Sequence, residues 1–259
     1  MSLHIITYST DKSRHKLLLE SAELFSIKIH IIHNDKWNGY VDKLIGAMNY
    51  INTLNDDELV LFTDAYDVLL TGPEHEILEK FYKYNCNILF SAELNCFPEK
   101  FKYSFDSIYP SIKNKYLNAG GYIGYVKDVK QMFEWKTLQD ISNICKHGGD
   151  QTYLMVYYLN NYKNLKLKID HGSEVFQSMH LISWDEIVFQ NGRLHNTVMK
   201  ANPCFVHFNG GTWRTNTKDN IMPVFFEKLK MSHENPSTLH DLKGYNQIIT
   251  NTCYPHLQL

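Results

Sequence analysis

The stretch Leu59-Val-Leu-Phe-Thr-Asp64-Ala-Tyr-Asp67-Val68 decides the fold of this chain. Its first five residues are apolar or β-branched, a pattern typical of a strand buried on both faces, and two carboxylates follow at once. The pattern predicts a strand over residues 58–63 with acidic side chains at its exit. Outward from this stretch, similar short apolar runs predict further strands over residues 3–8, 28–33 and 87–92.

Helical segments separate the predicted strands. Apolar residues recur at helical spacing over residues 13–25, 43–54 and 74–84. This alternation predicts an α/β fold with a mostly parallel central sheet covered on both faces, a Rossmann-like α/β/α sandwich. Such sheets bind ligands beyond the carboxyl ends of their strands, so useful polar residues should follow the strands directly. Ser9, Asp64 and Glu93 stand at such positions.

The second half of the chain is less regular. Residues 118–124, Asn-Ala-Gly-Gly-Tyr-Ile-Gly, predict a glycine-rich turn, and a helix is expected from residue 149 to 158 with Asp150 suited to its N-cap. Two more strands are predicted over residues 165–169 and 204–208. No linker or repeat is evident, so we expect one domain over residues 1–231 and a polar appendage over residues 232–259.

Composition excludes several classes of function. The 259 residues carry a formal net charge of -2, which gives no reason to expect binding to nucleic acid or to an anionic membrane. No apolar run is long enough for a signal peptide or a membrane span, so a cytoplasmic location is expected. Five cysteines without a CxxC pair favour reduced, buried thiols over a disulfide framework. The oligomeric state is not set by the sequence.

Asp64 and Asp67 are the first candidate metal ligands. Two carboxylates three residues apart on a short turn anchored by a strand suit Mg²⁺ or Mn²⁺, ions that proteins often hold together with substrate phosphates. The alternative is that these acids only cap the next helix. A haloacid dehalogenase-type phosphatase also places acids after an apolar strand, but that motif needs Asp-x-Asp, and here the spacing is Asp-x-x-Asp.

His207 and Asp150 are two further candidate site residues that the sequence pattern indicates. His207 ends a predicted strand and precedes Asn209-Gly-Gly211, where glycines permit close approach of the backbone to a phosphate. A hydrogen-bonded core histidine is the alternative. Asp150 follows two glycines and could place a carboxylate beside a substrate, or simply cap its helix.

Six motifs in this order resemble one known family. They are FTDAYDV, SAEL-x-x-FP, KYLNAGGYIGY, GGDQ, IDH and HFNGG, and they extend over most of the chain, from about residue 3 to 213. The series resembles the glycosyltransferase domain of the procollagen lysyl hydroxylases. The resemblance implies a GT-A fold, a UDP-sugar donor and Mn²⁺, with Mg²⁺ as the alternative cation.

The resemblance also implies roles for single residues. Asp64, Asp67 and His207 match the metal-binding residues of the family, and Asp150 and Asn118 match positions linked to the sugar-transfer step. The matching donor-binding positions are those near the uridine (Trp37 and Tyr66), near the nucleotide and its phosphates (Ser9 and Lys43) and at the diphosphate (Asn209 and Gly210).

Three departures from the family pattern bear on acceptor recognition. The acidic run of the family is reduced here to Lys146-His-Gly-Gly-Asp150, which leaves one acid. Phe97 stands where the family has an active-site tryptophan, and so lacks an N–H donor. The lysine that follows the HxNG segment in the family falls at Trp213, with Arg214 beside it.

The function implied by the resemblance is transfer of glucose from UDP-glucose to galactosylhydroxylysine in a collagen-like acceptor, with retention of configuration. Two alternatives stay open. One is a UDP-galactose-dependent hydroxylysine galactosyltransferase, and the other is a non-catalytic module that binds nucleotide sugars. The reduced acidic run is the only sequence feature that favours the second.

Overall fold

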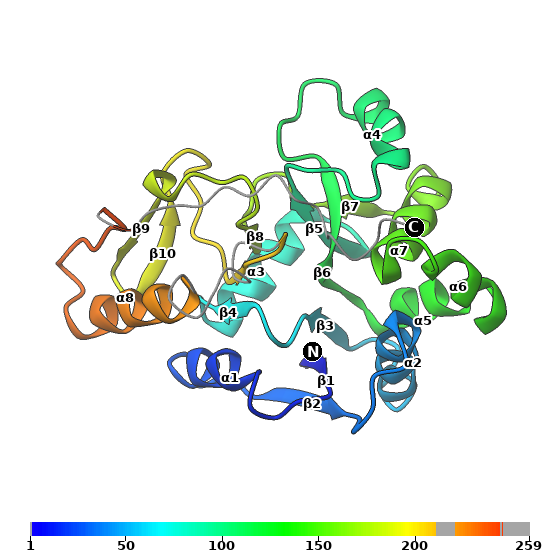
Figure 1. Cartoon of the computed structure of the whole chain (residues 1–259), viewed down its shortest axis with the longest axis horizontal. Coiled ribbons are helices and arrows are strands. Elements are labelled where there is room, and N and C mark those ends of the chain that lie inside the picture. Colours follow the sequence, from blue (N-terminus) through cyan, green and yellow to red (C-terminus); the bar gives the residue numbers. More distant parts are fainter. Residues whose placement is uncertain (1, 211–220, 244, 246–259) are drawn as a thin grey trace.

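The computed structural model describes residues 2–210, 221–243 and 245. A six-stranded sheet forms its centre, and five of the strands are parallel while β6 runs antiparallel to both of its neighbours. The mostly parallel sheet predicted from the sequence is thereby confirmed (Figure 1). In sheet order the strands are β2 (Ile29–His33), β1 (Leu3–Ser9), β3 (Leu59–Thr63), β6 (Tyr116–Tyr125), β5 (Ile88–Glu93) and β7 (Leu167–Ile169).

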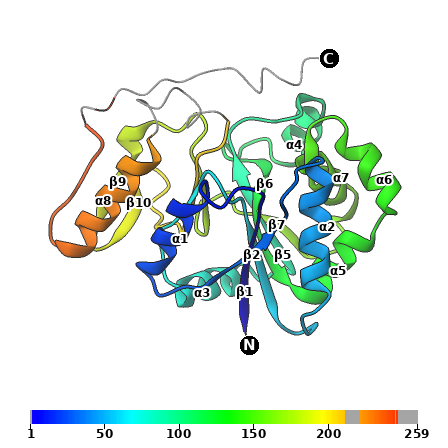
Figure 2. The ribbon, with the colours of Figure 1, turned by 60° about the horizontal axis from the view of Figure 1, so that its bottom comes forward.

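Helices cover both faces of this sheet, as Figure 2 shows. Alternate residues of β3 enter opposite cores, because successive side chains of a strand point to opposite faces. Val60 and Phe62 pack in the core under one helical layer, and Leu59 and Leu61 pack in the other. The first layer holds α2 (Tyr40–Ile51), α5 (Val126–Glu134), α6 (Leu138–Cys145) and α7 (Gly149–Asn161), and the second holds α1 (Lys16–Glu23) and α3 (Glu74–Tyr84).

A small second sheet carries part of the candidate site. Its middle strand β11 (Phe205–His207) pairs antiparallel with β4 (Val68–Leu70) and parallel with β8 (Phe176–Ser178). Beside it, a third apolar core lies between a hairpin and a helix: β9 (Ile187–Gln190), β10 (Arg193–Asn196) and α8 (Met222–Glu234). The helix α4 (Lys102–Ile108) and two short 3₁₀ turns, Glu99–Phe101 and Trp184–Glu186, complete the described elements.

Two local predictions are wrong. The expected turn over residues 118–124 belongs to strand β6, because Tyr116, Leu117, Tyr122 and Ile123 are buried and supply the apolar side chains of a central strand. The second concerns Asp150, since the N-cap of α7 is Gly148 and Asp150 lies inside the first turn. In both cases the glycines leave room for neighbouring side chains, and only Gly148 also lies in a turn.

The C-terminal part of the described chain packs against the third core. Helix α8 runs to Glu234, beyond the boundary expected at residue 231, and Ser232 is fully buried. Backbone bonds join Phe189 to His240, and Leu242 is buried in the same core. The division into residues 1–231 and 232–259 stays a prediction.

The thiols and the helices agree with the composition. Cys86, Cys96, Cys145 and Cys204 are buried and form no disulfide, as predicted, and Cys253 lies outside the described residues. In the part of the chain that the structure describes, every helix is too short or too polar to cross a bilayer.

Candidate metal centre and donor cavity

Asp64, Asp67 and His207 converge at the junction of the two sheets. The turn between β3 and β4 carries both acids, and β11 pairs with β4 so that His207 lies opposite Val68. The amide of Phe208 donates to the carbonyl of Asp67 at 2.8 Å and fixes this register. His207 Nε2 lies 3.4 Å from Asp67 Oδ2 and 3.6 Å from Asp64 Oδ2.

The ligand atoms of these three residues all lie within 4.8 Å of one another, close enough to share one cation. Asn118 sets the orientation of the imidazole. Its Oδ1 accepts from the amide of Gly120 at 2.9 Å and lies 3.0 Å from His207 Nδ1, so Nδ1 carries a ring hydrogen. Nε2 then faces the carboxylates. Burial lowers the pKa of His207, but the charges of these carboxylates outweigh burial and raise it. A bound cation would take the lone pair of Nε2 in place of a proton, and this donor set fits Mn²⁺ or Mg²⁺.

Gly120 makes room for the histidine. A Cβ at this position would lie 2.1 Å from His207 Cε1 and 2.3 Å from Nδ1, so the ring rests directly on the backbone of β6. The carbonyl of Gly120 accepts from the amide of Asp64 at 3.0 Å and ties the acidic turn to the same strand. Gly120, assigned to a turn from the sequence, therefore lies directly beneath the metal centre.

Lys43 joins the metal centre to Asp150. Its Nζ lies 2.7 Å from Asp64 Oδ1 and 2.5 Å from Asp150 Oδ2. Burial lowers the pKa of Lys43, but the two carboxylates outweigh burial and raise it. Burial raises the pKa of Asp64, and the opposing charges of Lys43 and His207 lower it overall. For Asp150, burial dominates and the pKa is raised in spite of Lys43.

Glu93 is a buried acid behind the metal centre. Its carboxylate accepts from Asn118 Nδ2 at 3.1 Å, Gln151 Nε2 at 2.8 Å and Asn209 Nδ2 at 2.8 Å. Burial raises the pKa of Glu93 to about 7, although these donors and His207 oppose the shift. In the sequence, the position of Glu93 at the end of a strand was the only indication of a function. No role was predicted for Glu93 or for Gln151.

A cavity of about 420 Å³ opens beside the acids. Its walls include the aromatic side chains of Tyr8, Trp37, Tyr40 and Tyr66, and the charged side chains of Lys43, Asp64 and Asp67 line it as well. The hydroxyl of Tyr66 accepts from the amides of Thr10 at 2.7 Å and Asp11 at 3.0 Å, which fixes this ring. An aromatic cavity next to a metal centre is suited to a nucleotide.

Arg14 is a wall residue of this cavity that the sequence did not suggest. Its guanidinium lies over the ring of Tyr66, 4.1 Å from the centroid. This cation stands beside the space available to an anionic ligand. A motif could not reveal it, because Arg14 and Tyr66 meet only through the fold.

A smaller cavity of about 80 Å³ continues from the donor cavity past Asp64 and Asp67. Asp150 and Phe97, both singled out in the sequence, lie in its walls. Tyr40, Lys43, Asp64 and Asp67 line both spaces, so they form the boundary between them. The remaining lining residues are Asn118, Ala119, Gly120, Gly148, Gln151 and His207.

Three predicted donor residues do not line either cavity. Ser9 is fully buried, with its Oγ 2.8 Å from His15 Nδ1. The amide of Asn209 is engaged on both sides, because Oδ1 accepts from the backbone of His180 at 3.0 Å and Nδ2 donates to Glu93. Gly210 packs against the ring of His180. Gly211, Trp213 and Arg214 lie outside the described residues.

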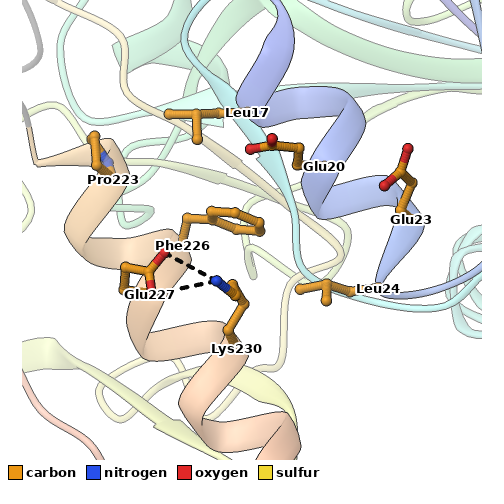
Figure 3. A pocket seen from close by; sticks show the side chains of 8 residues that line it. All are labelled: Leu17, Glu20, Glu23, Leu24, Pro223, Phe226, Glu227 and Lys230. Atoms are coloured by element: carbon orange, nitrogen blue, oxygen red, sulfur yellow. Dashed lines mark hydrogen bonds and ion pairs between the residues drawn. The ribbon is translucent and has the colours of Figure 1, made fainter.

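A further cavity of about 520 Å³ lies between α1 and α8 (Figure 3). Leu17 and Phe226 face each other across it, and Glu227 pairs with Lys230 at 3.2 Å along one wall. None of the predicted metal, donor or catalytic residues lines this groove. The candidate site is therefore the pair of cavities at the acidic turn.

The sheet order, together with an acidic turn that faces a histidine, defines the GT-A class of glycosyltransferases. Two solved structures share the fold: the galactosyltransferase LgtC in complex with donor and acceptor sugar analogs, and a glycosyltransferase involved in glycosylation of the major capsid of PBCV-1. Both have a TM-score of 0.50 and 12% identity. The match covers 88% of this chain and 96% of LgtC, and 89% of this chain and all of the second protein.

Within that class the family is defined by sequence. The family model described as the PLOD GT domain matches residues 1–229, and the chain belongs to this family. It is 30% identical over 231 residues to the human multifunctional procollagen lysine hydroxylase and glycosyltransferase LH3, covering 81% of this chain and 30% of that protein. It is also 30% identical over 212 residues to the procollagen-lysine,2-oxoglutarate 5-dioxygenase of Drosophila melanogaster, covering 74% and 28%. The chain thus spans less than a third of the length of these relatives.

Proposed function

We propose that this glycosyltransferase moves glucose from UDP-glucose to galactosylhydroxylysine of a collagen-like acceptor, with Mn²⁺ at Asp64, Asp67 and His207. The observation that carries the proposal is the convergence of these three side chains beside an aromatic cavity. The human relative is a procollagen lysine hydroxylase and glycosyltransferase by name, which supports the class of acceptor.

The donor cavity supports a nucleotide-sized ligand. Tyr66 is fixed by two backbone amides, and Trp37 lines the same cavity with an exposed ring that can cover a base. A nucleotide held by these rings would direct its diphosphate to the acids that line the cavity. Bound Mn²⁺ would supply positive charge that offsets the charge developing on departing UDP.

The side chains around the smaller cavity would act on the sugar. Asp150 places a carboxylate next to the sugar position, and Lys43 holds it there by an ion pair. Asn118 keeps the imidazole of His207 turned toward the acids. Such fixed charges stabilise a transition state because they need no reorganisation during the reaction.

A UDP-release assay over several nucleotide sugars tests this proposal. The acceptors are collagen with its glucose removed and collagen without either sugar, each assayed with Mn²⁺, Mg²⁺ or EDTA. We expect release of UDP from UDP-glucose with the first acceptor, abolished by EDTA. Release only from UDP-galactose with the second acceptor would establish the galactosyltransferase alternative.

Substitutions at the acids sharpen the test. Asp67→Asn should abolish activity and weaken Mn²⁺ binding, whereas Asp57→Asn, at an exposed acid outside the site, should change neither. Asp150→Asn should lower turnover at least about a hundredfold with little change in UDP affinity. Asp140→Asn, at another acid in the first turn of a helix, is the matched control. Binding of UDP with no release from any donor would indicate the non-catalytic module.

A further inference from the structure

Tyr40 stands at the boundary between the two cavities. It is the first residue of α2 and its side chain lines both the aromatic cavity and the smaller cavity that holds Asp150. It is 38% exposed, so part of the side chain is accessible to a ligand. A ligand that extends from the rings to Asp150 must therefore pass this side chain.

The ring of Tyr40 contacts two neighbours. It rests on the backbone of Gly149, where a Cβ would lie 2.8 Å from Cγ and 2.9 to 3.0 Å from the two Cδ atoms. Trp37 also contacts the ring in a T-shaped arrangement, with centroids 5.4 Å apart and an interplanar angle of 86°. Tyr40 therefore links the nucleotide side of the site to the first turn of α7.

The ring of Tyr40 can pack on the backbone of residue 149 only because this residue is glycine. Gly149 has φ +67°, which L side chains rarely adopt, and any side chain would displace the ring. The glycine before Asp150 thus accommodates an aromatic ring from α2 at a place where a longer acidic run would contribute charge. The wall beside Asp150 is thus partly apolar.

We propose that Tyr40 is a sugar-contacting residue that stacks on the apolar face of the donor hexose and so determines its position beside Asp150. The proposal rests on the proposed function, because it assumes a nucleotide sugar in these cavities. A pyranose ring presents C–H groups on its faces, and an exposed aromatic ring offers the complementary surface. Trp37 and Tyr66 remain for the base and ribose.

The competing role is structural support. If Tyr40 only held Trp37 in place, its loss would weaken UDP and UDP-glucose equally, since both carry the same nucleotide. If it contacts the sugar, only the ligand with the sugar is affected. The ratio of the two dissociation constants separates these roles.

Calorimetric titration with UDP and UDP-glucose in the presence of Mn²⁺ gives this ratio for the wild-type protein and Tyr40→Ala. We expect Tyr40→Ala to bind UDP-glucose about tenfold more weakly and UDP within about twofold of wild type. Tyr40→Phe should bind both like the wild type, because the ring is retained. Tyr103→Ala, at a tyrosine that is 85% exposed on α4, is the matched control.

A double-mutant cycle tests whether Gly149 acts on UDP-glucose binding through the ring of Tyr40. Gly149→Ala should lower UDP-glucose affinity by displacing the ring, and the same substitution in Tyr40→Ala should have a smaller effect. Equal effects in both backgrounds would show that residue 149 does not act through Tyr40. Gly172→Ala, where the nearest contact of an added Cβ is 3.4 Å, controls for the alanine, and thermal midpoints report whether each variant folds.

The two proposals can fail separately. The wild-type protein turns over UDP-glucose if the proposed function is correct. If Tyr40→Ala then loses affinity for UDP and UDP-glucose equally, or for neither, the role of Tyr40 is overturned and the proposed function stands. If Tyr40→Ala loses affinity only for UDP-glucose but the wild-type protein turns over no donor, the proposed function is overturned and the contact of Tyr40 with the sugar stands. A wild-type protein that binds neither ligand would overturn both.

Discussion

Asn118 connects the residues of the metal centre to the buried acid behind it. Its Oδ1 lies 3.0 Å from His207 Nδ1, and its Nδ2 donates to Glu93 at 3.1 Å. The side-chain amide of Asn118 thus fixes the tautomer of His207 and also donates a hydrogen bond to the carboxylate of Glu93. Residues that orient a ligand in this way usually affect the metal strongly although they never touch it.

Asn118→Ala should therefore weaken Mn²⁺ binding by about 10- to 100-fold, because the imidazole is no longer held toward Asp64 and Asp67. Titration calorimetry with Mn²⁺ alone measures this effect without need of turnover. Asn114→Ala removes a buried asparagine that bonds Ser173 away from the site and should leave Mn²⁺ affinity unchanged. Equal losses in both variants would contradict the orienting role.

Glu93 gives a pH-dependent prediction. Burial raises the pKa of this carboxyl group from 4.5 to about 7, so the folded state favours its neutral form. Its contribution to stability is fully present below pH 4.5 and is lost as the pH rises through 7. Between pH 5 and 8, the free energy of unfolding of the wild type should fall by about 3 kcal/mol relative to Glu93→Gln, which does not titrate.

Urea unfolding of both proteins in EDTA at the two pH values measures this difference. Glu79→Gln, at an exposed glutamate on α3, should show a constant difference from the wild type. A constant difference for Glu93→Gln as well would mean that the carboxylate is ionised throughout this range.

Strand β6 is the element on which the site is built. Its pairing with β5 is interrupted, so that Phe90 lies opposite Tyr122 and Ser91 opposite Asn118. Residues between these partners are released from the ladder, and Gly120 there receives the ring of His207. The irregularity thus brings a strand from the central sheet into contact with a strand from the small sheet.

Gly120→Ala should abolish Mn²⁺ binding, because the added Cβ would lie 2.1 Å from His207 Cε1 and the imidazole must move. The loss should exceed that in Asn118→Ala, since the ring is displaced and not only loosened. Circular dichroism and calorimetry with Mn²⁺ separate folding from binding, with Gly172→Ala as the control. Wild-type Mn²⁺ affinity in a folded Gly120→Ala would show that His207 is not a ligand.

The sequence predicted the elements with regular periodicity and failed where tertiary contacts decide. Helix α3 was predicted at residues 74–84, as observed, because its apolar spacing is local. Strand β6 was missed, since its glycines are explained only by His207 and Phe176, which lie far along the chain. The motifs identified Asp64, Asp67 and His207 as a group, whereas Arg14 and Tyr40 became visible only when the fold placed them beside the cavities.

On the scale of the whole molecule, the described thiols lie in tightly packed surroundings. Burial raises the pKa values of Cys86, Cys96 and Cys145 to about 12 and also raises the pKa of Cys204. At pH 8 about one in ten thousand of the first three would be ionised, and the thiolate is the reactive form. We expect these four cysteines to resist alkylation in the native protein and to react fully in urea.

Peptide mapping after treatment with a maleimide measures each cysteine separately. Rapid modification of Cys86 or Cys145 in buffer would contradict the packing of the layers around the central sheet. Protection of all four that disappears in one cooperative step with denaturant would indicate that the two cores on the faces of the central sheet unfold together.

Lys43 has a consequence for the protein without its cation. The acids at positions 64, 67 and 150 would repel one another in an empty centre, yet the ammonium group pairs with two of them and the imidazole faces the third. Without a bound cation, the ammonium group of Lys43 therefore acts as an internal counter-ion for these carboxylates. Under the proposed function, removal of the cation should therefore stop sugar transfer without unfolding the site, and renewed addition of the cation should restore it.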